Sequence, residues 1–377
     1  MNPGRTLSPF PPLAPLLVSA LLLLPVGCNS GSRRGGSSPT PTPDASGSDA
    51  AETPDASVED GSTDRDVVPT PRGHLYTEGR YLHDSCGNRL IVRGVEQVIG
   101  LGIDVDGSWE LLLDEIAGTG ANAIRILPNL EQLGPSDVDQ LLTAIGNRGM
   151  IAYVTPGIPE GTPDLAEQTI AWFLRGDVRE VLLRHERYIV LDAYQEGEFD
   201  DRSQWEAEAT DAVSRVRAAG YRAPLVALMN LFGRDLPSGL DGGARVVAAD
   251  PMGNTIIGWQ AYWGVDGNGY NYYSDIYGMT LSQAMERVRD AEFPIQVGLD
   301  AVTDPFVSPE SRLDYQTLMR DAQSYDVGWL WWDWYNPFGR DNNLTQNGTG
   351  RALTSYGTAV IEGPTGIRAT AARACIP

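Results

Sequence analysis

The chain has 377 residues, with 28 basic and 50 acidic side chains and a formal net charge of -22 at pH 7. This excess of negative charge disfavours binding to a phosphate backbone, so we expect no nucleic-acid partner. All the basic residues are arginines, which excludes Schiff-base lysine chemistry and a P-loop. Three histidines and three cysteines are too few for a His-rich or Cys-ligated metal centre, and we expect neither a metal nor an organic cofactor.

The first 28 residues have the pattern of an export signal. An apolar run over residues 13–26 follows Arg5, is too short for a permanent membrane span, and ends at Gly27-Cys28. This resembles a bacterial lipoprotein signal, which implies that residues 1–27 are a signal peptide and that Cys28 carries lipid. Pro25 replaces the usual aliphatic residue, so an ordinary secretory signal is the alternative. The first interpretation predicts a membrane-anchored lipoprotein facing the periplasm or the cell surface, and the second predicts a secreted protein.

Residues 28–72 consist mainly of Ser, Thr, Pro, Gly, Ala and Asp. No apolar face runs through this segment and its acids outnumber its arginines, so it lacks the material for a core. We expect a disordered tether that leads to a folded, monomeric domain over residues 73–377. The only expected membrane contact is the N-terminal lipid anchor.

Cys86 and Cys375 lie near the two ends of the folded domain. In an exported chain, two such cysteines are expected to form a disulfide that joins the ends of the domain. Two buried free thiols are the alternative.

Short runs of β-branched and aromatic residues alternate with longer segments of helical period. The expected strands cover residues 90–96, 123–128, 150–155, 188–194, 225–230, 255–262, 295–300 and 328–334. The expected helices between them include residues 109–116, 137–148, 205–219, 281–291 and 312–324. Eight strand–helix pairs predict an α/β fold, a single (β/α)8 TIM barrel. A doubly wound sheet is disfavoured because no Gly-rich phosphate turn follows the first strand.

Active sites of such barrels form at the carboxyl ends of the strands. The residues at these expected ends are Glu96, Arg125, Thr155, Glu196, Asn230, Tyr262, Asp300 and Trp334. Carboxylates after the fourth and seventh strands, Glu196 and Asp300, form the kind of pair that glycoside cleavage requires. One protonates the leaving oxygen while the other stabilises or attacks the anomeric carbon.

With these residues and four sequence stretches, the chain resembles glycoside hydrolase family five, in particular its β-mannanase-like and cellulase-like members. The stretches are residues 82–95, 118–126, 250–255 and 328–334, and the resemblance extends over residues 74–361. It implies Glu196 as the general acid/base and an active-site role for Arg125. It also implies substrate contacts from Gln195, Gln260, Tyr262, Trp263, Trp332 and Trp334, with Trp332 and Trp334 on the inward face of the last strand.

The chain departs from the family pattern at the nucleophile. Leu299 occupies the matching position, and Asp300 follows it. Because side chains alternate across a strand, an inward Leu299 would turn Asp300 away from the barrel mouth unless the strand end bends or bulges. The histidines that the family usually carries are also missing near Thr155 and at Gln260.

Each candidate has a structural alternative. Arg125 could pair with a neighbouring carboxylate, and Glu196 could belong to a solvated acidic loop with Asp192. A loop rich in tyrosine follows the sixth strand and could line a glycan site or pack on itself; its aromatic residues are Tyr262, Trp263, Tyr270, Tyr272, Tyr273 and Tyr277.

Three functional hypotheses follow. The protein is a retaining glycosidase for a neutral β-linked polysaccharide of mannan or glucan type, an inverting variant of it, or a catalytically silent lipoprotein that binds glycan. Leu299 favours the silent barrel, whereas Glu196, Arg125 and Tyr262 favour hydrolysis. The expected partner is in each case a polysaccharide or oligosaccharide.

Overall fold

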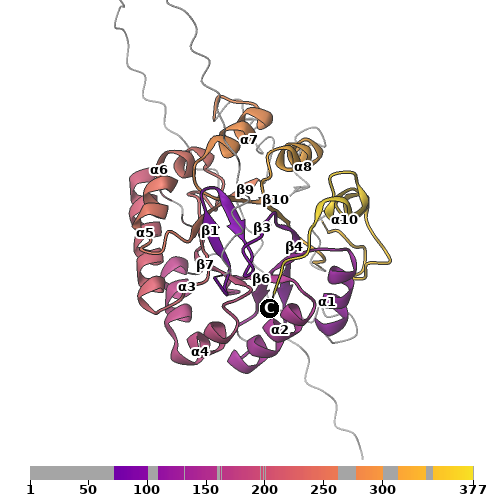
Figure 1. Cartoon of the computed structure of the whole chain (residues 1–377), viewed down its shortest axis with the longest axis horizontal. Helices are drawn as coiled ribbons and strands as arrows, with labels where there is room; N and C mark the ends of the chain where they lie inside the picture. Colours follow the sequence, from indigo (N-terminus) through magenta and orange to yellow (C-terminus); the bar gives the residue numbers. More distant parts are fainter. Residues whose placement is uncertain are drawn as a thin grey trace, which may run out of the picture. The chain divides into compact units, whose positions relative to one another are not determined.

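A computed structural model describes residues 72–376 except for 101–108, 131, 159–161, 163, 196, 198, 200, 262–276, 300–312 and 337–342. The predicted signal peptide, Cys28 and almost all of the predicted tether lie outside the described residues. Eight parallel strands close into a barrel in the order β10-β11-β4-β5-β6-β7-β8-β9, with helices around it (Figure 1). The predicted single (β/α)8 barrel is therefore confirmed.

The barrel strands match the predicted runs closely in the middle of the chain and less well at its ends. They are β4 (Arg93–Ile99), β5 (Ala123–Pro128), β6 (Ile151–Val154), β7 (Ile189–Tyr194), β8 (Leu225–Leu228), β9 (Thr255–Ala261), β10 (Ile295–Leu299) and β11 (Trp329–Trp331). The first strand starts and ends later than expected, which places Glu96 inside the strand. The last one ends at Trp331, three residues before the predicted end.

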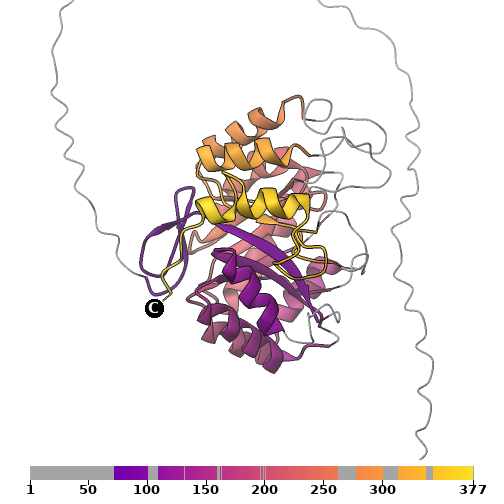
Figure 2. The ribbon, with the colours of Figure 1, turned by 90° about the vertical axis from the view of Figure 1, so that its right-hand side faces the viewer.

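The helices occupy the outer layer (Figures 1 and 2). They are α1 (Trp109–Gly118), α2 (Pro135–Asn147), α3 (Leu165–Leu174), α4 (Gly176–Arg184), α5 (Arg202–Ala218), α6 (Leu236–Ala249), α7 (Leu281–Asp290), α8 (Tyr315–Ser324), α9 (Ser355–Gly357), the π-helical turn η4 (Thr358–Glu362) and α10 (Ile367–Thr370). Side chains cap several starts; the Thr280 hydroxyl, for example, accepts from the backbone of Gln283 at α7. None of the described helices is both long and apolar enough to cross a membrane.

Alternation along the strands creates two apolar layers. Tyr153, Val226 and Leu330 belong to the layer inside the barrel. Trp331 faces outward and packs against Tyr315 and Tyr356 of the helical layer, with ring centroids 5.3 and 6.1 Å apart. This assignment of faces decides which strand residues can reach the barrel mouth.

A small antiparallel sheet covers the N-terminal end of the barrel. It consists of β1 (Tyr76–Glu78), β2 (Tyr81–His83) and β3 (Arg89–Leu90). Leu82 and Leu90 cluster with Ile151 and Ile256, which lie near the starts of barrel strands. The prediction that Leu90 begins the first barrel strand was therefore wrong, because this residue pairs with β2 instead.

A disulfide joins Cys86 of this region to Cys375 near the C-terminus. The Asp84 carboxylate supports the junction by accepting the backbone N–H groups of Cys86 and Cys375 at 3.0 and 2.9 Å. Both ends of the folded domain are thus fixed beside the covering sheet.

The same end of the barrel contains a buried ion pair, Arg217–Asp250. Two guanidinium nitrogens of Arg217 lie 2.9 Å from the two carboxylate oxygens. The remaining N–H groups donate to the carbonyls of Tyr221, Ala223 and Asn254. The Arg217 and Asp250 side chains are 3% and 0% exposed. A fully hydrogen-bonded pair of this kind is costly to break by removing one partner.

We expect Arg217→Leu to lower the free energy of unfolding by about 3–5 kcal/mol, because it leaves the Asp250 charge buried and unpaired. The control is Arg215→Leu on the same helix, which removes solvent-exposed pairs to Glu167 and Asp211 and should cost about 0–1 kcal/mol. Urea unfolding of the two variants measures the difference. Equal losses of unfolding free energy in the two variants would contradict the conclusion that the buried Arg217–Asp250 pair is costly to break.

Candidate functional site

Arg125 links three barrel strands inside the barrel. Its Nη1 lies 2.7 Å from Glu96 Oε2 on β4, and its Nη2 lies 2.7 Å from Asp192 Oδ2 on β7. Its Nε donates at 2.7 Å to both Asp192 Oδ2 and the hydroxyl of Thr155, which directly follows β6. The Thr155 hydroxyl in turn donates to Asp192. Alternation places these side chains on the inner face, and strand register sets Glu96 beside Arg125.

The electrostatics of this cluster follow from two carboxylates that share one guanidinium. Burial raises the pKa of Glu96, and Arg125 opposes that shift. Burial also raises the pKa of the neighbouring Tyr153, whose hydroxyl donates to Gln296. Arg125 pairs with the neighbouring carboxylates of Glu96 and Asp192, as the alternative interpretation of this residue expected. Asp192 does not belong to a solvated acidic loop; it is 1% exposed within a strand.

Gln195 begins the segment that follows β7. It is buried, and its Nε2 donates to the carbonyl of Pro156 at 3.2 Å, so one amide N–H is used within the protein. Gly197 is packed so tightly that a Cβ there would lie 2.0 Å from the Tyr194 hydroxyl oxygen. Just before this segment, the register of β7 against β8 shifts between Asp192 and Tyr194.

Gln260 and Gly298 face each other on neighbouring strands. They are paired in register between β9 and β10, and a Cβ on Gly298 would lie 1.9 Å from Gln260 Oε1. Both residues line a small cavity together with the Arg125 cluster and Gln296. Gln260 therefore belongs to the inner surface, as its predicted place in the site requires.

Leu299 does not face the barrel mouth. It pairs in register with the outward-facing Trp331 and is fully buried in the outer apolar layer. Gly298 and Gln296 occupy the inner face of the same strand. An inward Leu299 would direct Asp300 away from the barrel mouth. Because Leu299 faces outward, this objection to Asp300 does not apply.

Trp332 and Trp334, the two residues of the stretch 328–334 that were predicted to contact substrate, differ in burial. Trp334 is 0% exposed, and its indole N–H donates to the carbonyl of Gly348 at 3.0 Å, so it is a core residue and not an open sugar platform. The prediction failed because β11 ends at Trp331 and strict alternation stops there. Trp332 is half-buried, and its backbone N–H donates to the carbonyl of Leu299.

Four predicted site residues, Glu196, Tyr262, Trp263 and Asp300, lie outside the described residues, as do the loop tyrosines other than Tyr277. The Tyr277 hydroxyl donates to the carbonyl of Arg234.

The sequence patterns did not identify Glu96 and Asp192 as the partners of Arg125. An acid inside an otherwise apolar strand, as Asp192 is, was the available signal. Within the described ranges, no group of three or more His, Cys, Asp or Glu residues is arranged to hold a metal ion.

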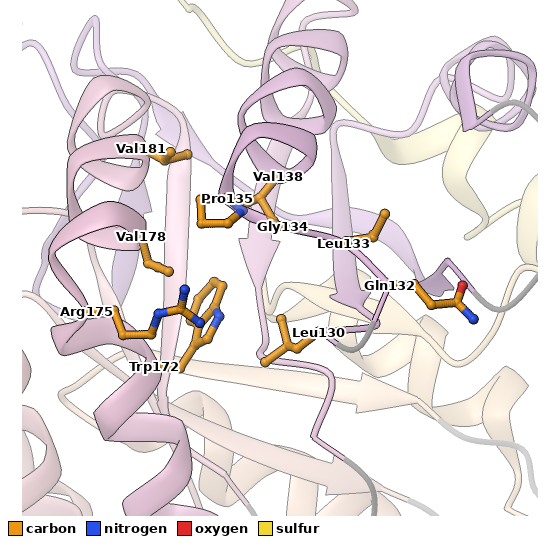
Figure 3. Close-up of a pocket in the computed structure, with 10 residues that line it drawn as sticks. All are labelled: Leu130, Gln132, Leu133, Gly134, Pro135, Val138, Trp172, Arg175, Val178 and Val181. Atoms are coloured by element: carbon orange, nitrogen blue, oxygen red, sulfur yellow. The ribbon is translucent and has the colours of Figure 1, made fainter.

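A separate cavity of about 220 Å³ lies outside the barrel between α2 and α4 (Figure 3). Trp172 and the aliphatic residues Val138, Val178 and Val181 form the apolar part of its wall, and Gln132 and Arg175 also line it. Arg175 at its edge forms an exposed ion pair with Asp177. None of the predicted site residues lines this cavity, so it is distinct from the candidate site.

No family model matches the chain. Among curated proteins, it is 26% identical over 325 residues to a mannan endo-1,4-beta-mannosidase of Cellvibrio japonicus, covering 80% of this chain and 69% of the relative. A protein of the same name from Salipaludibacillus agaradhaerens is 24% identical over 306 residues, covering 78% and 93%.

Solved β-mannanases have the same fold. The mannotriose complex of the Thermomonospora fusca enzyme has a TM-score of 0.66 and 23% identity, covering 80% of this chain and 98% of the other. The Streptomyces thermolilacinus enzyme with mannohexaose has a TM-score of 0.67 and 21% identity, covering 80% and 97%. The predicted resemblance to family-five mannanases is therefore confirmed for the fold.

We expect Arg125→Met to lower the free energy of unfolding by about 3–5 kcal/mol at pH 7.5, because two buried carboxylates lose their cation. The loss should shrink at pH 5.5. Without Arg125, the raised pKa of Glu96 rises further in the folded state, so the folded state takes up a proton more readily as the pH falls. Urea midpoints at the two pH values measure this effect.

The control is Arg148→Met, which removes an arginine whose two acidic partners, Glu110 and Asp114, are solvent-exposed. Its loss should be small and nearly independent of pH between 5.5 and 7.5. A loss for Arg125→Met that grows on acidification would refute the electrostatic account of the cluster.

Proposed function

We propose that the protein is a glycoside hydrolase that cleaves the β-1,4 bonds of mannan within the polymer. The observation that carries this proposal is the match of about 80% of the chain to proteins named mannan endo-1,4-beta-mannosidase. The shared barrel supports it, and so does a cavity inside the barrel that Arg125, Gln260 and Gln296 line. An acidic protein also suits a neutral substrate better than an anionic one.

Glu196 is the proposed general acid/base. Its sequence neighbours Gln195 and Gly197 are both hydrogen-bonded to adjacent loops, which supports a preorganised position for the segment. In a retaining reaction, a protonated Glu196 would donate to the leaving glycosidic oxygen while the second carboxylate bonds to the anomeric carbon. Glu196 would then accept a proton from the water that displaces that carboxylate. In an inverting reaction, Glu196 would act only as the acid.

Asp300 is the proposed second carboxylate. Gln296 and Gly298 occupy the inner face of β10, and Leu299 the outer face. Continued alternation would give position 300 the inner face. The silent glycan-binding alternative rested on Leu299 at the position that matches the family's nucleophile, but Leu299 packs in the outer apolar layer and does not occupy the barrel mouth. The silent alternative is therefore not favoured.

The substrate we propose is a β-mannan chain or its oligosaccharides, since two of the matched structures are complexes with mannotriose and mannohexaose. Gln195, Gln260 and Trp332 are the described residues that we assign to the substrate-binding surface, and on the family resemblance we assign Tyr262 and Trp263 to it as well. Arg125 supports this surface through its pairs with Glu96 and Asp192 and does not offer a free charge to the sugar.

We further propose that the protein is exported as a monomer and held by lipid on Cys28, with residues 28–72 as its tether. The apolar run that ends at Gly27-Cys28 and the polar composition of residues 29–71 support this assignment. The Cys86–Cys375 disulfide is consistent with an oxidising compartment.

We expect the purified domain to release reducing sugar from mannan and glucomannan. Glu196→Gln should lower kcat by about 10²–10⁴-fold, because the leaving oxygen loses its proton donor. Asp300→Asn should lower kcat at least as much as Glu196→Gln does, because the carboxylate that acts on the anomeric carbon is lost. Glu198→Gln and Asp304→Asn, in the same two segments, are the matched controls and should retain activity.

The anomeric form of the first product, followed by NMR, separates retention from inversion. Full activity in Asp300→Asn would refute its role and require a different carboxylate. No release from either polysaccharide by the unmodified protein would refute the hydrolase assignment.

A further inference from the structure

The connection between β8 and α6 has an unusual backbone. Leu231, Phe232 and Gly233 follow one another with φ values of 53°, 59° and 81°. The left-handed region is unfavourable for residues that carry a Cβ, so two non-glycine residues in succession store conformational energy. Contacts on both sides of this turn must hold it in place.

On one side, the turn is bonded to the segment that follows β7. The Asn230 side chain accepts the N–H of Phe199 at 3.0 Å and donates to the carbonyl of the same residue at 2.8 Å. The backbone N–H of Phe232 donates to the carbonyl of Gly197 at 3.2 Å. Asn230 is 1% exposed, so these bonds are shielded from competing water.

On the other side, the turn contacts the end of β9. The carbonyl of Gly233 accepts the backbone N–H of Gln260 at 2.8 Å. A Cβ on Gly233 would lie 2.5 Å from Gln260 Cγ, so only glycine fits against this side chain. Gln260 in turn covers Gly298 on β10.

We propose that the left-handed turn Asn230–Gly233 is a positioning element that holds Gly197 and Phe199, the bonded residues of the segment 195–199, in register with Gln260. This inference rests on the proposed function, because that segment contains the proposed acid/base. Consecutive left-handed residues direct the Phe232 N–H and the Gly233 carbonyl toward two different strand ends. One turn thereby fixes Gly197 and Phe199 relative to the inner surface of β9 and β10.

The first test is Asn230→Ala, with Asn122→Ala as its matched control. Asn122 is also 1% exposed and also clamps the backbone, accepting from Arg93 and donating to Ile91 and Ala372, but it does so away from the candidate site. Both variants should lose stability. Only Asn230→Ala should lower kcat on mannan by about 10–100-fold, with a much smaller change in KM.

Leaving-group dependence separates positioning from a general structural effect. A dinitrophenyl β-mannobioside has a leaving group that needs little protonation, unlike the sugar leaving group of mannan. If Asn230 positions the acid/base, the deficit of Asn230→Ala in kcat/KM should shrink at least several-fold on the activated substrate. An equal deficit on both substrates would overturn the proposal.

The second test is Gly233→Ala, compared with Gly149→Ala. Gly149 also has a positive φ, 72°, but open space around its Cβ position. Both variants impose a left-handed alanine, and only Gly233→Ala also pushes on Gln260. We therefore expect lowered kcat in Gly233→Ala alone, and equal activities would count against the proposal.

Amide hydrogen exchange gives a readout that does not depend on hydrolysis. In Asn230→Ala, exchange should accelerate at least about 10-fold at residues 195–199, whereas Asn122→Ala should leave that segment unchanged. Unchanged exchange in Asn230→Ala would overturn the inference whatever the activity. An unmodified protein without hydrolytic activity would instead refute the proposed function, and the exchange result would then decide the anchoring role by itself.

Discussion

Two buried carboxylates sharing one guanidinium form the constraint on which the inner surface of this barrel depends. Arg125 must stay between Glu96 and Asp192, because either acid would otherwise be an uncompensated charge in an apolar interior. The pairs tie β4, β5 and β7 together, and Thr155 adds the end of β6. Of the described residues proposed to contact substrate, Gln195 directly follows β7 and is supported by this half of the barrel, whereas Gln260 lies on β9 and Trp332 directly follows β11.

The periodicity of apolar residues predicts the eight barrel strands. It does not predict the covering sheet or the point at which the last strand ends. Alternating strand and helix patterns located all eight barrel strands, because these patterns report burial on fixed faces. Leu90 was misassigned because a strand in the covering sheet and a strand in the barrel have the same local pattern. Trp334 was misassigned because alternation cannot be extended past Trp331, where the strand ends.

The candidate site was predictable as a set of chemical groups and less so as a geometry. Its strand position identified Arg125 and the family resemblance pointed to Gln260, and the structure places both on one inner surface. The inward or outward direction of Leu299 depends on which face of β10 meets the helices, and that is a tertiary property. The turn at Leu231 and Phe232 was likewise invisible, because neither residue favours a left-handed backbone.

The disulfide beside the covering sheet has a mechanical consequence. Cys86 and Cys375 are separated by 289 positions in the sequence, and all eight barrel strands lie between them. Tension applied at the two ends of the folded domain would pass through a covalent bond and bypass the barrel. Only the short stretches outside the two cysteines could be drawn out. A domain pulled by its two ends would therefore keep its barrel closed.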